Sequence, residues 1–291
     1  MPYLFSVTLL WAFSFSLIGV YLAGQVDPWF SVLMRIALAT LVFLPFLRIR
    51  QVSAMTALKL MAIGAVQLGL MYVFYYQSFL FLSVPEVLLF TVMTPIYVTL
   101  INDACEGLFH PDFMLTALLA TAGAAAIRYN GVDAGFITGF FLVQAANLCF
   151  AIGQVAYKRL LDKRELKQQT IFAWFFIGAL IVAALCYAVF GNSEKLPATG
   201  LQWSVLIYLG TIASGLGYFA WNKGATLVNI GALAVMNNLL IPAGIVVNLL
   251  IWNHDADIQR LMVGGALIVL SLLLNQWLDR KRRLNKKRLS L

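Results

Sequence analysis

The sequence predicts an all-α membrane protein with ten transmembrane helices, and the first supporting observation is its composition. Of the 291 residues, 62% are hydrophobic and only 11% are charged, whereas about 25% of the residues of a soluble domain are charged. The 20 basic and 12 acidic side chains cannot cover the surface of a 32.2 kDa protein in water. Most of the surface must therefore face lipid. This excludes an ordinary soluble enzyme, a nucleic-acid-binding domain and a disulfide-rich secreted module.

The second observation is the length of the apolar runs. A transmembrane helix needs about 20 apolar residues, and the chain supplies ten such runs. They lie at about 3–23, 28–47, 57–78, 84–102, 113–129, 135–157, 170–190, 203–222, 230–251 and 261–278. Strands of a membrane barrel are short and alternating, and a helix satisfies its own backbone polar groups in lipid. No basic residue precedes the first run and nine runs follow it, so we expect a span rather than a cleaved signal peptide.

The basic residues predict which side of the membrane each loop faces. With the N-terminus in the cytoplasm, sixteen Lys and Arg residues fall in the inner loops and the tail, and three fall in the outer loops. The three outer residues are Arg128, Lys195 and Arg260. This distribution satisfies the positive-inside rule and predicts that both termini are cytoplasmic. The basic segment 280–291 is expected to anchor the topology and to touch anionic lipid, with binding of a partner as the alternative.

Two landmarks recur at nearly the same interval and predict an internal repeat. Residues 72–83 (YVFYYQSFLFLS) resemble residues 218–229 (YFAWNKGATLVN) at an offset of 146, and 94–96 resemble 241–243 at an offset of 147. Five spans per half is an odd number, so the two halves would cross the membrane in opposite senses. Such a 5+5 inverted-topology repeat is typical of secondary transporters. We expect a first repeat at 1–130, a second at 131–279 and the tail at 280–291.

One proline lies within the fourth predicted span and another at the matching place in the ninth. These are Pro95 and Pro242. A proline inside a helix removes a backbone hydrogen bond and bends the helix. Either proline alone could be a passive kink that packing tolerates. Their matched occurrence favours a hinge or a bend that lines a cavity in each half.

The groups that a catalytic site would need are missing from the expected membrane interior. The only histidines, His110 and His254, lie in predicted loops, and no HExxH, GxxxxGK[ST] or Cys/His cluster occurs. The three cysteines have neither metal-ligand nor disulfide spacing. Ser214 has no histidine at membrane depth to act as its base. We therefore predict no enzyme, no metal and no cofactor. A membrane scaffold or receptor without flux is the alternative from another functional class.

Among the charged residues within or at the ends of the predicted spans, three are candidates for a functional role, since charge at membrane depth by default indicates function. Arg35 could attract an anionic substrate, or it could reach outward or pair with a backbone carbonyl. Glu86 completes a capping box that begins at Ser83; its alternative role is that of a proton-coupling carboxylate. Lys223 either marks the cytoplasmic boundary of the eighth span or holds the carboxylate of an anion.

Neutral polar residues and aromatic residues in the spans predict a polar cavity. Gln144, Asn147 and Gln154 share one face of the sixth span. Hydrogen bonding between helices is the alternative role of such amides and contributes only about 0.6 kcal/mol on average. The repeat, however, would bring the amides of the sixth and ninth spans together, and the aromatic rings could stack on a flat ligand. The predicted lining is Trp11, Ser14, Tyr72, Tyr75, Gln144, Asn147, Tyr218, Trp221, Asn237 and Asn238.

Seven local stretches carry a family resemblance from the first predicted span to the ninth. They are 11–16 (WAFSFS), 21–24 (YLAG), 44–48 (LPFLR), 88–91 (LLFT), 173–175 (AWF), 214–219 (SGLGYF) and 236–238 (MNN). With ten spans in two groups of five, the chain resembles the EamA branch of the drug/metabolite transporter superfamily. More narrowly, it is similar to the bacterial inner-membrane biotin transporters of that branch.

The resemblance implies a secondary transporter of the bacterial inner membrane that takes up biotin by alternating access. Its partners would be this small molecule and the lipid bilayer, without nucleic acid; the sequence predicts no oligomeric state. A transporter of amino acids or of another small carboxylate is the alternative, since a fold does not fix a substrate. Inward transport of a monoanion costs about 2.3 kcal/mol per 100 mV. Accumulation would need proton symport, exchange or trapping, with Glu86 as the leading carboxylate for proton coupling.

If biotin is the substrate, its chemical groups imply roles for the residues of the predicted lining. Carboxamides can satisfy the donors and the acceptor of its ureido group, and the expected residues are Asn147, Asn237 and Asn238 with Gln144. The aromatic residues Trp11, Tyr72 and Tyr218 would flank the fused rings. Either Arg35 or Lys223 would lie near the carboxylate.

Overall fold

The computed structural model describes residues 2–107, 134–161, 166–228 and 230–252, together with scattered positions between 259 and 281. Across these residues the chain is helical and contains no strand. Seven helical segments in this part of the chain are long and apolar enough to cross a membrane. The predicted span at 113–129 lies outside the described residues, as does most of the one at 261–278.

The other eight predicted spans correspond to helical segments whose ends fall within a few residues of the predicted ones. Four are single α-helices and one ends in a short 3₁₀ turn, whereas three are built from two or three consecutive segments. They are α1 (Pro2–Tyr21); α2 (Pro28–Phe43) with η1 (Leu44–Phe46); α3 (Ala54–Gly64), η3 (Ala65–Leu70) and α4 (Met71–Ser78); α5 (Val84–Thr91) and α6 (Thr94–Cys105); α8 (Ala134–Leu161); α9 (Gln168–Phe190); α10 (Gly200–Ile207), η4 (Tyr208–Leu216) and α11 (Gly217–Thr226); and α12 (Ile230–Ile251). A further 3₁₀ turn, η2 (Ile49–Gln51), precedes α3.

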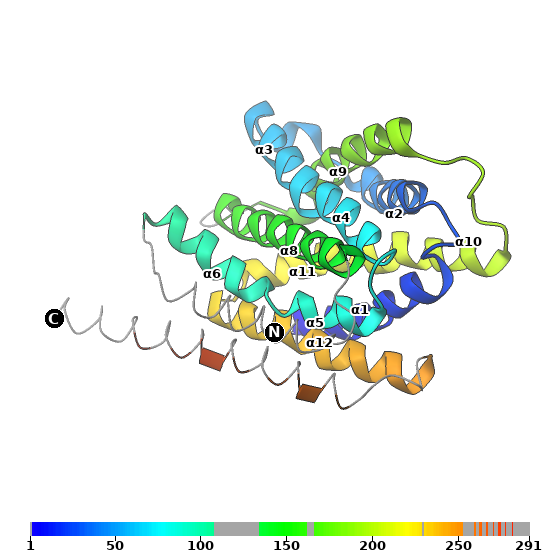
Figure 1. Cartoon of the computed structure of the whole chain (residues 1–291). Helices are drawn as coiled ribbons and strands as arrows, with labels where there is room; N and C mark the ends of the chain where they lie inside the picture. Colours follow the sequence, from blue (N-terminus) through cyan, green and yellow to red (C-terminus); the bar gives the residue numbers. More distant parts are fainter. Residues whose placement is uncertain are drawn as a thin grey trace.

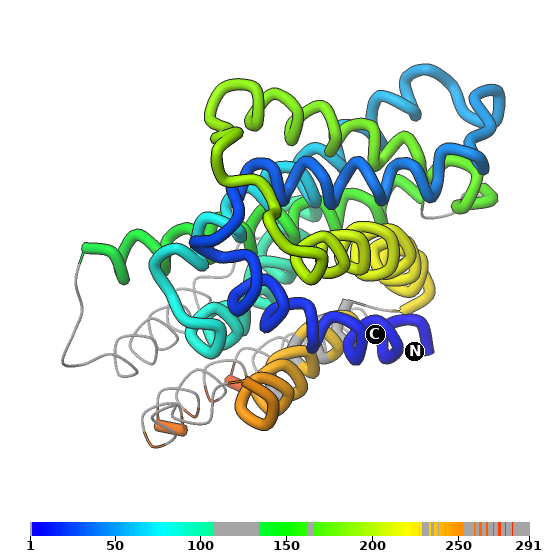
Figure 2. Tube along the Cα trace, turned by 90° about the vertical axis from the view of Figure 1, so that its right-hand side faces the viewer, coloured from blue at the N-terminus to red at the C-terminus, as the bar shows by residue number. Residues whose placement is uncertain are grey.

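The helices form a bundle in which segments far apart in the sequence lie side by side (Figure 1). α9 packs against α2 and α3, and α8 packs against α4 and α6 in the middle of the bundle. α1 packs along α12 and α11 on the other side, as the second view also shows (Figure 2). The helices therefore surround a central region to which α1, α2, α4, α8 and α12 all contribute.

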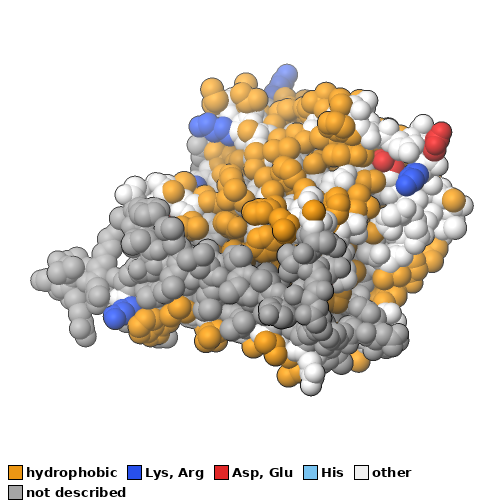
Figure 3. All heavy atoms as spheres, viewed as in Figure 1, with side chains coloured by type: hydrophobic (Ala, Val, Ile, Leu, Met, Phe, Trp, Pro, Cys, Tyr) orange, Lys and Arg blue, Asp and Glu red, His pale blue; other side chains and the backbone are white. Residues whose placement is uncertain are grey.

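The outer faces of these helices carry large apolar side chains. Phe141 on α8, Leu185 on α9 and Leu250 on α12 are 64%, 62% and 71% exposed. Figure 3 shows such side chains spread over a broad face that carries few charged groups. Water would not stabilise a surface of this kind, so these faces contact lipid, and the molecule is a multi-pass membrane protein.

Two spans contain a π-helical segment in the middle of the span. These are η3 and η4, and a shift of 146 residues places η3 inside η4. The two sequence landmarks recur at nearly this offset. A π-helical segment inserts extra residues into a helix and occurs often at functional sites. The coincidence supports the predicted correspondence between the third and eighth spans.

The fourth span is interrupted beside the first of the matched prolines. α5 ends at Thr91, and α6 begins at Thr94 with Pro95 in its first turn. Thr94 Oγ1 donates to the carbonyl of Thr91 at 2.7 Å and so bridges the break. The backbone of α12, by contrast, continues as a helix through position 242. The side chain of Pro242 lies outside the described residues.

Two glycines bring the backbones of α3 and α9 into direct contact. A Cβ atom on Gly64 would lie 1.8 Å from the carbonyl oxygen of Phe175, and one on Gly178 would lie 1.9 Å from that of Met61. No side chain fits at either position. Small residues allow close approach of this kind between membrane helices, where packing replaces the hydrophobic effect as the source of stability.

Candidate binding pocket

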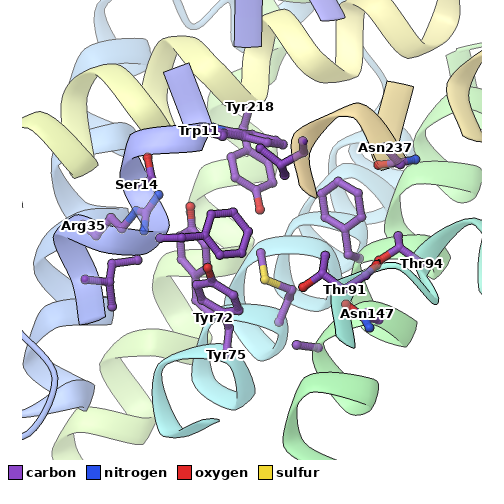
Figure 4. A pocket seen from close by; sticks show the side chains of 16 residues that line it. Trp11, Ser14, Arg35, Tyr72, Tyr75, Thr91, Thr94, Asn147, Tyr218 and Asn237 are labelled. Carbon is purple, nitrogen blue, oxygen red and sulfur yellow. The ribbon is translucent and has the colours of Figure 1, made fainter. Parts of the chain in front are cut away.

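A pocket of about 650 Å³ lies in the central region of the bundle (Figure 4). The lining comes from helices of both predicted repeats and consists of Trp11, Ser14, Phe15, Ile18, Arg35, Met71, Tyr72, Tyr75, Thr91, Thr94, Ala146, Asn147, Phe150, Tyr218, Asn237 and Leu240.

One end of the pocket contains a buried cation. Arg35 on α2 is only 2% exposed, so it does not reach outward to the membrane surface. Its Nε donates to Ser214 Oγ at 2.5 Å, and its NH1 donates to the Tyr76 hydroxyl at 3.3 Å. The guanidinium carbon lies 4.3 Å from the centre of the Tyr72 ring, a cation–π contact.

The groups that hold Arg35 are neutral hydroxyls and a ring. Tyr72 and Ser214 also share a hydrogen bond of 2.9 Å. Among the described residues, no carboxylate forms an ion pair with Arg35. A cation buried at membrane depth is costly unless a countercharge reaches it. This end of the pocket therefore favours an anionic group on the ligand.

The opposite end of the pocket carries two asparagines (Figure 4). Asn147 on α8 donates both of its amide hydrogens, to the carbonyl of Phe90 at 2.9 Å and to Gln144 Oε1 at 3.2 Å. Asn237 on α12 donates to the carbonyl of Leu233 at 3.1 Å. These bonds engage both N–H groups of Asn147 and one of Asn237, which leaves the Oδ1 atoms as acceptors at the pocket.

Aromatic rings line the pocket between its two ends. Trp11 Nε1 donates to the carbonyl of Ala213 at 2.8 Å, which fixes the indole against η4. The Tyr218 ring lies 4.9 Å from Trp11, and Phe15 meets Tyr75 edge-on at 5.4 Å. These contacts hold the rings in place before any ligand arrives, so they present rigid apolar surfaces.

Two predicted lining residues, Gln144 and Trp221, support the lining from behind. Gln144 Oε1 accepts from Asn147 and, at 3.2 Å, from the hydroxyl of Tyr97. Trp221 is fully buried with its ring 5.1 Å from Trp11, and its Nε1 donates to Gln154 Oε1 at 3.0 Å. Both residues therefore position a side chain that does line the pocket.

The remaining predicted positions lie elsewhere. Lys223 Nζ is 5.2 Å from the ring of Tyr3 near the start of α1, which fits a residue at the boundary of the span. Glu86 Oε2 accepts from both the backbone N–H and the hydroxyl of Ser83 at 2.8 Å, so the predicted capping box is confirmed. The side chain of Asn238 lies outside the described residues.

The structure also adds lining residues that sequence reasoning missed. Thr91 and Thr94 reach the pocket because they flank the break between α5 and α6. Phe15 and Phe150 could have been found, since each lies one helical turn from a predicted lining residue. Ser214 carried a signal as a buried serine, but it acts as a hydrogen-bond partner of Arg35.

Comparison with known proteins agrees with this membrane architecture. Residues 137–277 match the sequence profile of the EamA-like transporter family. The chain is 54% identical over 278 residues to the "probable biotin transporter" of Pseudomonas aeruginosa, covering 95% of this chain and 97% of that one. It is 50% identical over 282 residues to the "biotin transporter" of Salmonella typhimurium and 49% identical over 282 residues to that of Escherichia coli, with 97% of this chain and 93% of each relative covered.

A solved crystal structure shares the fold with a TM-score of 0.67 at 18% sequence identity, and the match covers 96% of this chain and 97% of that one. The named relatives are transporters rather than enzymes, as the missing catalytic groups predicted. Since the identity to these relatives is about 50% over nearly the whole length, the chain belongs to the EamA-like transporter family.

Proposed function

We propose that the protein is a secondary transporter that takes up biotin across the bacterial inner membrane. The observation that carries the proposal is the polarity of the pocket, with the Arg35 cation at one end and the Asn147 and Asn237 oxygens at the other. Biotin has complementary groups in the same order, a carboxylate at one end and a ureido group at the other. The names of relatives about 50% identical support this choice.

The hydrogen-bonding chemistry of the amides supports the assignment of the ureido end. A ureido group presents two N–H donors, and Asn147 and Asn237 present two amide oxygens. Each asparagine is oriented by a hydrogen bond from its amide nitrogen to a backbone carbonyl. Gln144 holds Asn147 in this orientation. The apolar rings of the ligand would then lie against Trp11 and Tyr218.

We further propose that the site lies near the membrane midplane between repeats 1–130 and 131–279 and is exposed alternately to each side. The matching positions of η3 and η4 support the inverted repeat. Both termini would be cytoplasmic, with 280–291 as the basic tail.

A transporter of another small carboxylate is the second candidate, because Arg35 would attract any such anion. The two amide oxygens favour biotin over carboxylates that have no N–H donors distant from the carboxylate, as is the case for amino acids with aliphatic side chains. The carboxylate charge also bears on the energetics. Moving a monoanion inward costs about 2.3 kcal/mol per 100 mV, so accumulation requires coupling, exchange or trapping.

The test is initial-rate uptake of labelled biotin by cells that lack their own biotin transporter and produce this chain. We expect saturable uptake that unlabelled biotin competes and that amino acids do not. Addition of a protonophore would measure the dependence on proton motive force. An inserted, folded protein that gives no saturable uptake of biotin, but takes up another carboxylate, would overturn the proposal in favour of the second candidate.

A further inference from the structure

Ser14 on α1 carries a hydroxyl that has no hydrogen-bond partner among the described residues. The side chain is only 4% exposed, and it lines the pocket. Ser and Thr within a helix commonly donate to the carbonyl four residues earlier. Thr8, Thr40 and Thr99 of this chain all do so, at 2.8–2.9 Å. The hydroxyl of Ser14 does not make this bond.

The carbonyl four residues before Ser14 is engaged by another helix. Leu10 O accepts a hydrogen bond of 3.3 Å from the hydroxyl of Tyr208, at the start of η4. One residue later, Trp11 donates to Ala213, which also belongs to η4. These two bonds fix this turn of α1 against η4. The hydroxyl of Ser14 remains available at the pocket surface.

Arg35 approaches the same π-helical segment from α2, through its bond to Ser214. Figure 4 shows Ser14 and Arg35 at one end of the pocket, away from Asn147 and Asn237. A ligand that enters this end meets a cation and an unpaired hydroxyl donor together. A carboxylate has two oxygens, so it can accept from both groups at once.

We propose that Ser14 and Arg35 form a carboxylate subsite, in which the Ser14 hydroxyl donates to one oxygen of the ligand and Arg35 binds the other. The subsite makes the free acid the preferred form of the ligand over its neutral amide. The choice of biotin as the ligand rests on the proposed function, whereas the preference for a carboxylate rests on these two residues alone.

The experiment compares two ligands on purified protein. Biotin and biotinamide share the rings and the ureido group, and they differ in the charge of the chain end. For Ser14→Ala we expect about 10- to 100-fold weaker binding of biotin, as for loss of a hydrogen bond to a charged group. Binding of biotinamide should weaken less than that of biotin, by about 2- to 10-fold, because its carbonyl oxygen can accept from the hydroxyl but carries no charge. Ser14→Thr keeps the hydroxyl and should restore most of the affinity for biotin.

Ser31→Ala is the matched control. Ser31 on α2 is fully buried, its Oγ also has no hydrogen-bond partner among the described residues, and it does not belong to the pocket lining. We expect unchanged binding of both ligands. Equal weakening of biotin and biotinamide in Ser14→Ala would indicate a role in packing and would contradict the subsite. Unchanged binding of biotin would contradict it as well.

The experiment distinguishes failure of the proposed function from failure of the carboxylate subsite. If the wild-type protein binds another small carboxylate and not biotin, the proposed function fails. The same comparison then uses that carboxylate and its amide. A larger loss for the acid than for the amide in Ser14→Ala would still support the subsite, and an equal loss for both forms would overturn it.

Discussion

Arg35 and Ser214 are hydrogen-bonded to each other although 179 residues of sequence separate them. The bond joins α2 to η4 and therefore links the two predicted repeats at the wall of the pocket. The Arg35 side chain faces the inside of the bundle, because Ser214 and Tyr76 both accept hydrogen bonds from its guanidinium group. A cation in this position determines the charge of the ligand that the pocket can hold.

Replacement of Arg35 should therefore weaken ligand binding. Loss of a buried charge partner costs about 2–5 kcal/mol, so Arg35→Gln should raise the KM for uptake by about 30-fold or more. Arg35→Lys should recover part of the loss, because the ammonium keeps the charge but not the planar fork of donors. KM is measured in cells with matched membrane abundance, and Arg50→Gln in the exposed η2 turn is the control. A wild-type KM in Arg35→Gln would remove Arg35 from the site.

The two asparagines at the end of the pocket opposite Arg35 should contribute to the affinity for the ligand. Asn147→Ala and Asn237→Ala each remove one acceptor that faces the pocket, at a cost of about 1–3 kcal/mol. We expect KM to rise by about 5- to 100-fold while the amount of protein in the membrane stays the same. Asn192→Ala, in an exposed loop, should change nothing. Unchanged kinetics in either variant would exclude that residue from the ureido site.

Pro95 should affect the rate of transport more than the affinity. Pro95→Ala restores a backbone N–H group at the start of α6 and permits a continuous helix across the break. We expect a lower maximal rate with binding affinity nearly unchanged, and the predicted repeat implies the same direction for Pro242→Ala. Pro28→Ala is the control, since Pro28 occupies the first turn of α2, where proline is favoured. A wild-type rate in Pro95→Ala would show that the break is a passive kink.

Two substitutions of Glu86 distinguish a role in capping α5 from a role in proton coupling. Glutamine also completes a capping box, so Glu86→Gln should fold normally and should still accumulate substrate when a pH gradient is imposed on vesicles. Glu86→Ala loses the cap and should destabilise the start of α5 by about 1 kcal/mol. Exchange without accumulation in Glu86→Gln would instead identify this carboxyl as the proton-coupling group.

Gly64 should be intolerant of any side chain. The methyl group of Gly64→Ala would lie within 1.8 Å of the Phe175 carbonyl oxygen, so the α3 and α9 backbones must separate. Overpacking of this kind costs about 1–3 kcal/mol or more, and thermal unfolding of the purified protein should show a clear loss of stability. Gly200→Ala is the control because nothing lies within 4 Å of its added Cβ. Equal stability of the two variants would contradict the close contact.

The sequence predicted the helical spans well because lipid imposes a simple rule on length and polarity. It also identified Arg35 and Asn147, since polar groups at membrane depth are costly and therefore informative. The sequence could not predict which face of a span points inward in the residues that follow a π-helical segment. Extra residues in η4 shift the helical phase of the whole of α11, in which Tyr218 lines the pocket and Trp221 lies behind it.

Thr91 and Thr94 were missed for a related reason. Both lie in an apolar run that reads as one continuous helix. Only the interruption between α5 and α6 turns them toward the pocket. Proline marks such a break in the sequence, but the residues that the break exposes depend on the packing around it.

The glycine contact between α3 and α9 also limits how the bundle can move. The two helices belong to different predicted repeats, yet their backbones touch at Gly64 and Gly178 with no side chain between them that could repack. Sliding one helix by a turn would drive a bulkier residue into a carbonyl group. If the two repeats rock against each other as proposed, this crossing would be the pivot. The helices that surround the pocket would then rotate about it, while the distance between α3 and α9 at the crossing would stay fixed.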